Sequence, residues 1–200
     1  MEKLVLYLIR HGKTEANEKH LYCGKSNIGL SENGIIELND IKNKIKYPES
    51  NNFFTSGAKR ANETLEILYP KKSYCKINEF WEYDFGDFEM KSYEMLKENK
   101  EYINWITDKD GQVSCPNGES KTQYRERIKE AFNNLVEKCY KESISTAVLI
   151  SHGGTIGTIL EVFYDSSKSF YEYQPACGRG YALTIEKSDN KSKIINIDNI

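Results

Sequence analysis

The chain has 200 residues, of which 38% are hydrophobic and 29% are charged, and these proportions are typical of one ordinary globular domain. The formal net charge of −2 gives no reason to expect nucleic acid or a membrane surface as a partner. The sequence shows no signal-peptide pattern, and its five cysteines are scattered without metal-ligand spacing, so we expect a cytoplasmic protein with reduced thiols.

Apolar runs and amphipathic segments alternate through the first half of the chain. Residues 3–9 are rich in Leu, Val and Ile, which predicts a strand buried on both faces. Ser31 stands where it can cap a helix that runs to about Ile45. The next predicted elements are a strand at 52–55, a helix over about 58–68 and a short strand at 75–78.

The second half begins with an irregular stretch rich in aromatic residues and then resumes the alternation. Its predicted elements are a helix around 92–105, turns within 108–118, a helix from Ser120 to about Lys141, a strand at 146–151, a helix from Gly153, and two strands within 180–197 joined by a turn at Ser188-Asp189-Asn190. Strands that alternate with helices predict an α/β fold, here a three-layer sandwich whose mostly parallel central sheet is flanked by helices.

Two of the three histidines stand just past an apolar run and just before a glycine. His11 follows the first predicted strand, and His152 follows the strand at 146–151. Ligands of α/β proteins bind at the C-terminal ends of the strands, so we expect the two imidazoles to meet at one pocket. The third histidine, His20, lies in a polar loop without a motif, and we interpret it as structural.

Four sequence blocks resemble, in the same order, those of the histidine phosphatase superfamily, also called the phosphoglycerate mutase-like family. The resemblance covers Leu4 to about Leu160. The matching residues are Arg10, His11, Gly12, Thr14 and Asn17 in the first block, Ser56, Arg60, Ala61 and Thr64 in the second, Glu82, Phe85 and Gly86 in the third, and Ser151, His152, Gly153 and Gly154 in the fourth. The segments 21–24 and 30–34 are most similar to the bacterial α-ribazole phosphatase branch.

The resemblance implies a phosphoglycerate mutase-like fold in which His11 is the nucleophile that becomes phosphorylated. It implies one domain over 1–200, with 80–118 as a cap or insert over the active site. The residues that it assigns to the phosphoryl group or the substrate are Arg10, Asn17, Cys23, Gly24, Arg60, His152 and Gly153.

By the same resemblance, Glu82 is the proton donor, and its aromatic neighbours are expected to shield it from water. Only its spacing to Gly86 favours Glu82 over three nearby acidic residues, which are Glu79, Asp84 and Glu89.

The chemistry of phosphoryl transfer requires an in-line nucleophile, neutralisation of negative charge and a proton for the leaving oxygen. A neutral imidazole is a competent nucleophile near pH 7 if its other nitrogen has an acceptor, for which the carbonyl of Gly12 is a candidate. The guanidinium groups of Arg10 and Arg60 match phosphoryl oxygens in shape and charge, so we expect neither a metal nor a cofactor to be needed.

We therefore expect a phosphomonoester hydrolase that acts on a small phosphorylated metabolite, with α-ribazole phosphate as one candidate. A phosphotransferase of the phosphoglycerate mutase type uses the same chemistry and stays open as an alternative, and a non-catalytic protein that binds phosphorylated ligands is a third. The oligomeric state is left open. Three positions depart from the family pattern: Lys13, Met90, where a glycine is usual after Glu89, and Gly157.

Overall fold

The computed structural model describes residues 2–188 and 191–200. They form a six-stranded sheet in the order β3-β2-β4-β1-β5-β6. The strands β1 to β4 run parallel, β5 pairs antiparallel with β1, and β6 pairs antiparallel with β5. The strands are β1 (Glu2–Arg10), β2 (Phe53–Thr55), β3 (Cys75–Lys76), β4 (Thr146–Ser151), β5 (Gly180–Ser188) and β6 (Lys191–Asn199). The predicted fold class, a mostly parallel sheet flanked by helices, is confirmed.

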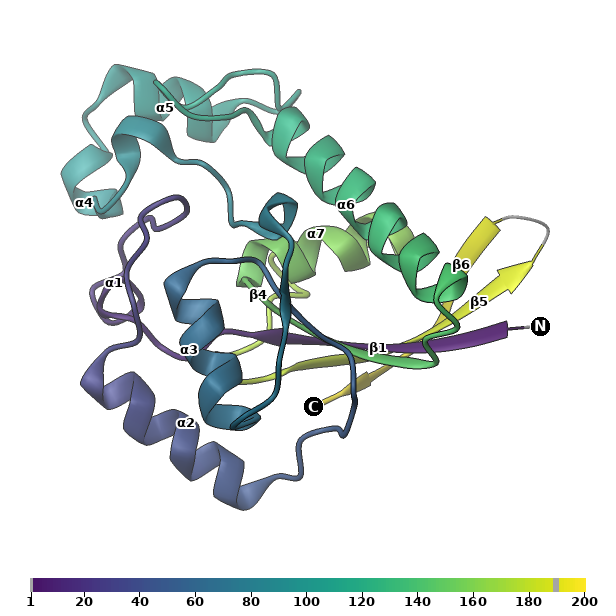
Figure 1. Cartoon of the computed structure of the whole chain (residues 1–200). Helices are drawn as coiled ribbons and strands as arrows, with labels where there is room; N and C mark the ends of the chain where they lie inside the picture. Colours follow the sequence, from purple (N-terminus) through teal and green to yellow (C-terminus); the bar gives the residue numbers. More distant parts are fainter. Residues whose placement is uncertain (1, 189–190) are drawn as a thin grey trace.

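Helices cover both faces of the sheet, with α2 and α3 on one side and α6 and α7 on the other (Figure 1). The helices are α1 (Glu15–Glu18), α2 (Glu32–Lys44), α3 (Lys59–Leu68), α4 (Tyr93–Leu96), α5 (Lys100–Thr107), α6 (Lys121–Lys141) and α7 (Gly153–Phe163), and short 3₁₀ helices lie at Asn78–Phe80 and Gly86–Phe88. Ser31 caps α2 as expected, because its side chain accepts a hydrogen bond from the backbone N–H of Gly34.

The two faces of the sheet have separate cores because side chains alternate along each strand. Leu6 and Leu8 of β1 pack with residues of α6 and α7, whereas Ile9 packs with residues of α2 and α3. Likewise, Leu149 of β4 belongs to the first core and Ile150 to the second. A strand buried on both faces has to be apolar at every position, which explains the unbroken apolar runs in the sequence.

The predicted helix around 92–105 is wrong in its continuity, because the structure divides it into α4 and α5. The side chain of Asn99 accepts a hydrogen bond from the N–H of Tyr102 at 3.0 Å and so begins a new helix. The strand expected at 75–78 ends at Lys76, since a 3₁₀ helix starts two residues later. The turn expected at Ser188-Asp189-Asn190 falls at positions 189 and 190 outside the described residues.

The aromatic segment 80–118 lies beside the N-terminal loops (Figure 1), and its buried side chains belong to the same core as those of α6 and α7. Phe88, Tyr102 and Trp105 are buried there, and their rings contact one another. The hydroxyl groups of Tyr22 and Tyr102 lie 2.5 Å apart, which ties the loop after α1 to α5. A role for this segment as a cap stays a prediction.

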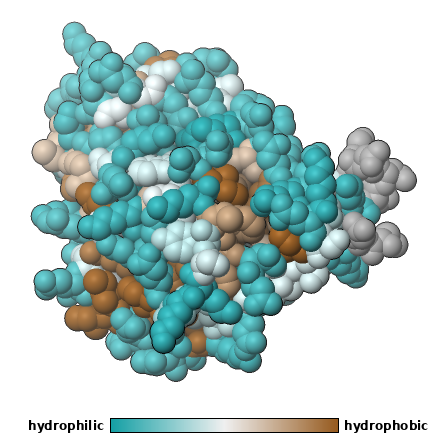
Figure 2. All heavy atoms as spheres, in the orientation of Figure 1, coloured by the Kyte–Doolittle hydropathy of each residue, from teal (hydrophilic) through white to brown (hydrophobic). Residues whose placement is uncertain are grey.

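The molecular surface is largely hydrophilic on the face drawn in Figure 2, with an apolar patch over α2. Ile36 of α2 is 60% exposed. Among the described residues, no helix combines the length and the apolar character that a membrane span requires.

Met90 has a backbone φ of +57°, a left-handed conformation that glycine adopts more easily than other residues. We expect Met90→Gly to raise the free energy of unfolding by about 1 kcal/mol relative to Met90→Ala, because both changes remove the side chain but only glycine relieves the backbone. Urea denaturation of the two variants measures the difference. Equal stability of the glycine and alanine variants would contradict this account.

Candidate active site

The two histidines come together because the strands that precede them are paired neighbours. β1 and β4 are parallel, and Arg10 lies opposite Ser151 in their register. The backbone N–H of His11 then donates to the carbonyl of Ser151 at 2.9 Å, just before His152. The centroids of the two imidazole rings lie 5.2 Å apart. Residues that are 141 positions apart in the sequence therefore share one site at the C-terminal edge of the sheet.

The imidazole of His11 is held in one tautomer. Its Nδ1 lies 2.7 Å from the carbonyl oxygen of Gly12, which can only accept a hydrogen bond. Nδ1 therefore carries the proton, and the lone pair is on Nε2. Burial lowers the pKa of His11 well below its usual value, and the positive charges of Arg60 and Arg10 lower it further. The ring is neutral at pH 7 and nucleophilic at Nε2.

His152 contacts protein groups through both ring nitrogens. Nε of Arg60 donates to Nδ1 at 3.3 Å, so Nε2 carries the proton and donates to Oγ of Ser56 at 2.8 Å. Burial and the nearby charge of Arg60 lower the pKa of His152, so this ring is also neutral. Direct contact with a phosphoryl oxygen, as the sequence predicts, would require one of these hydrogen bonds to be exchanged.

Arg60, in the first turn of α3, is a buried cation with only 1% of its surface exposed. Its two terminal nitrogens donate to the carbonyls of Ser26 and Gly24, at 2.9 and 2.8 Å. With the bond to His152, three of its five N–H groups are satisfied by the protein. The guanidinium also lies 5.8 Å from the ring centroid of Trp81. These contacts fix its plane and leave two N–H groups for an anion.

Arg10, at the end of β1, is held less completely than Arg60. One terminal nitrogen donates to the carbonyl of Pro175 at 2.9 Å. Within the described part of the chain, its Nε is a buried side-chain atom without a hydrogen-bond partner. A Cβ on Gly153 would lie 3.1 Å from the centre of the guanidinium, so glycine lets α7 begin against it. An unpaired buried donor at a helix N-terminus is suited to an anion.

Glu82 reaches the same helix terminus from the segment after the first 3₁₀ helix. Its carboxylate accepts hydrogen bonds from the N–H of Gly154 at 2.8 Å and from the hydroxyl of Tyr124 at 2.6 Å. The N–H of Tyr83 is a third donor, at 3.0 Å. A Cβ on Gly154 would lie 2.5 Å from this carboxylate, so the close approach requires glycine. Donors therefore fix its position beside α7.

The other predicted contact residues lie in the loops after β1. Oδ1 of Asn17 accepts from the N–H and the hydroxyl of Thr14, in the capping box that begins α1. The thiol of Cys23 is half-buried, and burial raises its pKa, so it is protonated. Gly24 already uses both its N–H and its carbonyl in contacts with Glu89 and Arg60. Substrate contacts of these residues stay predictions.

Neither Tyr124 nor Ser56 has a role that the sequence predicts. Tyr124 lies on α6 and is 5% exposed, and its hydroxyl donates the shortest of the three hydrogen bonds to Glu82 described above. In the sequence Tyr124 resembles any core aromatic residue of an amphipathic helix, so no local signal distinguishes it as a partner of Glu82. Ser56 belongs to a block that the sequence does reveal, and its partner is His152. Glu89, a rival of Glu82 as proton donor, instead accepts hydrogen bonds from the backbone of the loop at Gly24.

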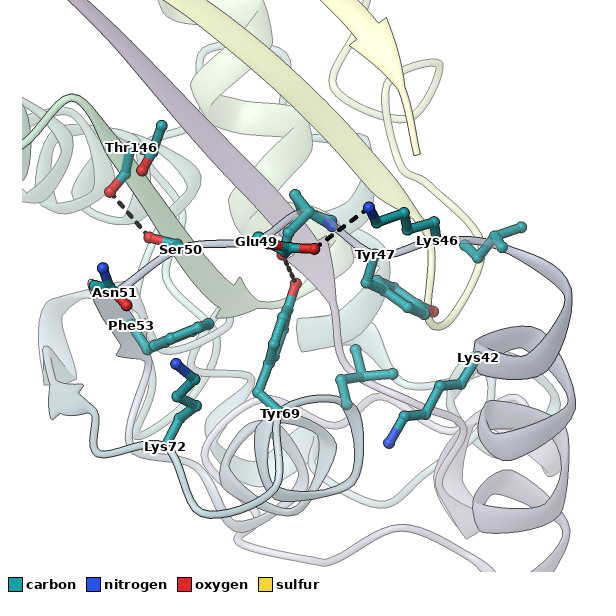
Figure 3. Close-up of a pocket in the computed structure, with 13 residues that line it drawn as sticks. Lys42, Lys46, Tyr47, Glu49, Ser50, Asn51, Phe53, Tyr69, Lys72 and Thr146 are labelled. Carbon is teal, nitrogen blue, oxygen red and sulfur yellow. Dashed lines mark hydrogen bonds and ion pairs between the residues drawn. The ribbon is translucent and has the colours of Figure 1, made fainter.

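A hollow of about 670 Å³ lies at the opposite end of the sheet from both histidines (Figure 3). Its lining includes Tyr69, Lys72 and Thr146, which is the first residue of β4, and it includes none of the predicted site residues. The helices α2 and α3 end beside it, so the negative ends of their dipoles face the hollow. Lys42, Lys46 and Lys72 also line the hollow, so charge alone does not exclude an anion there, but the hollow is remote from both histidines.

The chain is similar to known proteins over nearly its whole length. The sequence profile of the histidine phosphatase superfamily (branch 1) matches residues 6–197. An adenosylcobalamin/alpha-ribazole phosphatase of Salmonella typhimurium is 26% identical over 199 residues, covering 96% of this chain and 95% of the relative. The solved alpha-ribazole phosphatase of Shigella flexneri aligns with a TM-score of 0.79 at 23% identity, over 96% of this chain and 94% of that one. A phosphoglycerate mutase of Bacillus anthracis aligns with a TM-score of 0.77 at 22% identity, over 96% and 92%.

The two buried neutral imidazoles make stability depend on pH. Below the ordinary histidine pKa of 6.5, the unfolded chain binds protons that the folded chain excludes, so the free energy of unfolding falls as the pH falls. Each histidine contributes a slope of up to about 1.4 kcal/mol per pH unit. We expect His11→Asn to remove about half of this slope in denaturant titrations between roughly pH 6.5 and 5.5.

A matched control for this experiment is His20→Asn. His20 is exposed and has a φ of +52°, which asparagine tolerates. We expect its replacement to leave the slope unchanged. A slope that is the same with and without His11 would contradict the burial of a neutral ring at this position.

Proposed function

Because the chain belongs to the histidine phosphatase superfamily (branch 1), we propose that it is a phosphomonoester hydrolase that acts through a phosphohistidine on a small phosphorylated metabolite. The observation that carries this proposal is the pairing of a nucleophile with cations. Nε2 of His11 bears a lone pair, and the charges of Arg10 and Arg60 are close enough to lower the pKa of its ring.

The first step in this proposal transfers the phosphoryl group to His11. Nε2 attacks phosphorus as the ester oxygen leaves, while N–H groups of Arg10 and Arg60 bind the oxygens on which negative charge spreads. The amides at the start of α7 add partial positive charge. Since these donors are held in place before the substrate arrives, little reorganisation accompanies the reaction.

Glu82 supplies the proton that the leaving oxygen needs. The carboxyl group has to carry a proton at that step, and its contact with the N–H of Gly154 places it at the start of α7, beside the proposed phosphoryl site. After the ester oxygen leaves as an alcohol, the carboxylate can accept a proton from the water that attacks the phosphohistidine. Phosphate is then released, and His11 returns to its neutral state. The hydrogen bond from Tyr124 holds the carboxylate in position throughout.

The proposed substrate class follows from the relatives. A relative of nearly equal length is named an adenosylcobalamin/alpha-ribazole phosphatase, so α-ribazole phosphate is the first compound to test. Among the described residues, no three His, Cys, Asp or Glu side chains lie close enough together to hold a metal ion. Since Arg10 and Arg60 can neutralise the phosphoryl charge, we propose that the reaction needs no metal, and we expect activity to survive treatment with EDTA.

Isotopic labelling tests the intermediate. After incubation with a ³²P-labelled phosphomonoester and an alkaline quench, which preserves phosphohistidine, we expect label on the wild-type protein and on His20→Asn but not on His11→Asn. Equal labelling of the His11 variant would overturn the proposed nucleophile. Isomer formation in excess of phosphate release would instead indicate a phosphotransferase of the mutase type.

The leaving group tests the proton donor. We expect Glu82→Gln to lower kcat for an alkyl phosphate by about 10²–10⁴, and to lower it by less than about tenfold for p-nitrophenyl phosphate, because nitrophenolate leaves without a proton. Gly154→Ala should show the same selectivity, since its Cβ would displace the carboxylate. The exposed Glu79 provides a control, and Glu79→Gln should behave as wild type. Equal losses on both substrates would exclude Glu82 as the acid.

A further inference from the structure

The carboxylate of Glu89 occupies a nest of backbone amides. It accepts hydrogen bonds from the N–H groups of Gly24 and Lys25, both at 2.9 Å, and from Ser26 at 3.2 Å. The N–H of Phe85 donates to it as well, at 3.2 Å. Successive amides that converge on one point are a typical anion site, and here the anion belongs to the protein itself.

The same loop turns its carbonyls toward the phosphoryl site. The carbonyls of Gly24 and Ser26 accept the hydrogen bonds from Arg60 that fix the guanidinium plane. The loop therefore presents its amides to one charged residue and two of its carbonyls to another. Because each peptide unit is rigid, holding the amides in place also sets the direction of the neighbouring carbonyls.

We propose that Glu89 is a positioning residue for the phosphoryl site, which orients Arg60 through the backbone of Gly24–Ser26. Glu89 is not itself a catalytic residue, because its carboxylate is taken up by four backbone donors. This inference rests on the proposed function, in that Arg60 has to bind the phosphoryl oxygens. It also gives the loop a role that does not depend on contact with the substrate.

Glu89 also joins the loop to the segment that carries Glu82. Phe85 follows Glu82 by three residues, and its N–H shares the oxygen Oε1 of Glu89 with the N–H of Gly24. One carboxylate therefore sets the spacing between the loop that holds Arg60 and the chain that holds the proposed proton donor. Loss of this carboxylate should therefore weaken the binding of phosphate while the sheet stays folded.

The test measures the affinity for inorganic phosphate by titration calorimetry, which does not require turnover. We expect Glu89→Ala to weaken phosphate binding by about tenfold or more, as expected when a buried charged donor loses its orientation. Glu89→Gln keeps the size of the side chain but turns an NH₂ group toward backbone donors, and it should weaken binding in the same direction. If the alanine variant does not fold, the glutamine variant provides the test.

A double-mutant cycle with Arg60→Ala separates positioning from general stability. If Glu89 acts through Arg60, its removal in the Arg60→Ala background should change phosphate affinity by less than about twofold. The acid limb of the kcat/KM profile should also move to higher pH in Glu89→Ala, because a displaced Arg60 no longer lowers the pKa of His11.

Glu63 is the matched control. Its carboxylate also holds a nearby loop, accepting from the N–H of Leu30 at 2.7 Å, but Leu30 is not among the described hydrogen-bond partners of Arg60, which are His152, Ser26 and Gly24. Glu63→Gln should leave phosphate affinity and the acid limb unchanged. Unaltered affinity in both Glu89 variants, or effects of Glu89 and Arg60 that simply add, would overturn the inference. Wild-type protein that binds no phosphate would overturn the proposed function with it.

Discussion

The parallel pairing of β1 with β4 is the constraint on which the site depends. Its register places Arg10 opposite Ser151, so the residues that follow, His11 and His152, leave the sheet side by side. Both strands are buried on both faces, and a slip of one residue would exchange the side chains between the two cores. The packing that stabilises the sheet thus also fixes the distance between the two imidazoles.

Burial then gives these groups their chemistry. Desolvation and two guanidinium charges keep both imidazoles neutral, which is the state that a nucleophile requires. A buried guanidinium is stable only when its donors are satisfied, and the carbonyls of Gly24 and Ser26 meet that need for Arg60. Carbonyls are dipoles rather than charges, so they satisfy the donors of Arg60 without neutralising its positive charge, which an anion can then neutralise.

Much of this architecture could be predicted from the sequence, because the relevant signals are local. The unbroken apolar runs before His11 and His152 predicted the two central strands, and Ser31 and Ser120 predicted helix starts that the structure confirms. The carbonyl of Gly12 was expected to set the tautomer of His11, and it lies within hydrogen-bond distance.

The remainder depends on contacts between distant residues. The break between α4 and α5 is invisible because apolar residues on both sides of Asn99 keep a helical spacing. Tyr124 looks like a core residue until Glu82 is placed beside it. Only its spacing to Gly86 separated Glu82 from Glu89 as a proton donor, since three of the four backbone partners of Glu89 lie more than 60 residues away in the chain.

A crystal structure with orthovanadate, which mimics the phosphoryl group in transfer, would test the central claim most directly. The account predicts vanadium bound to Nε2 of His11, with its oxygens accepting from Nε of Arg10 and from the guanidinium of Arg60. Vanadate bound elsewhere, for example among the lysines of the hollow beside α2 and α3, with the edge between the two imidazoles left empty, would contradict it.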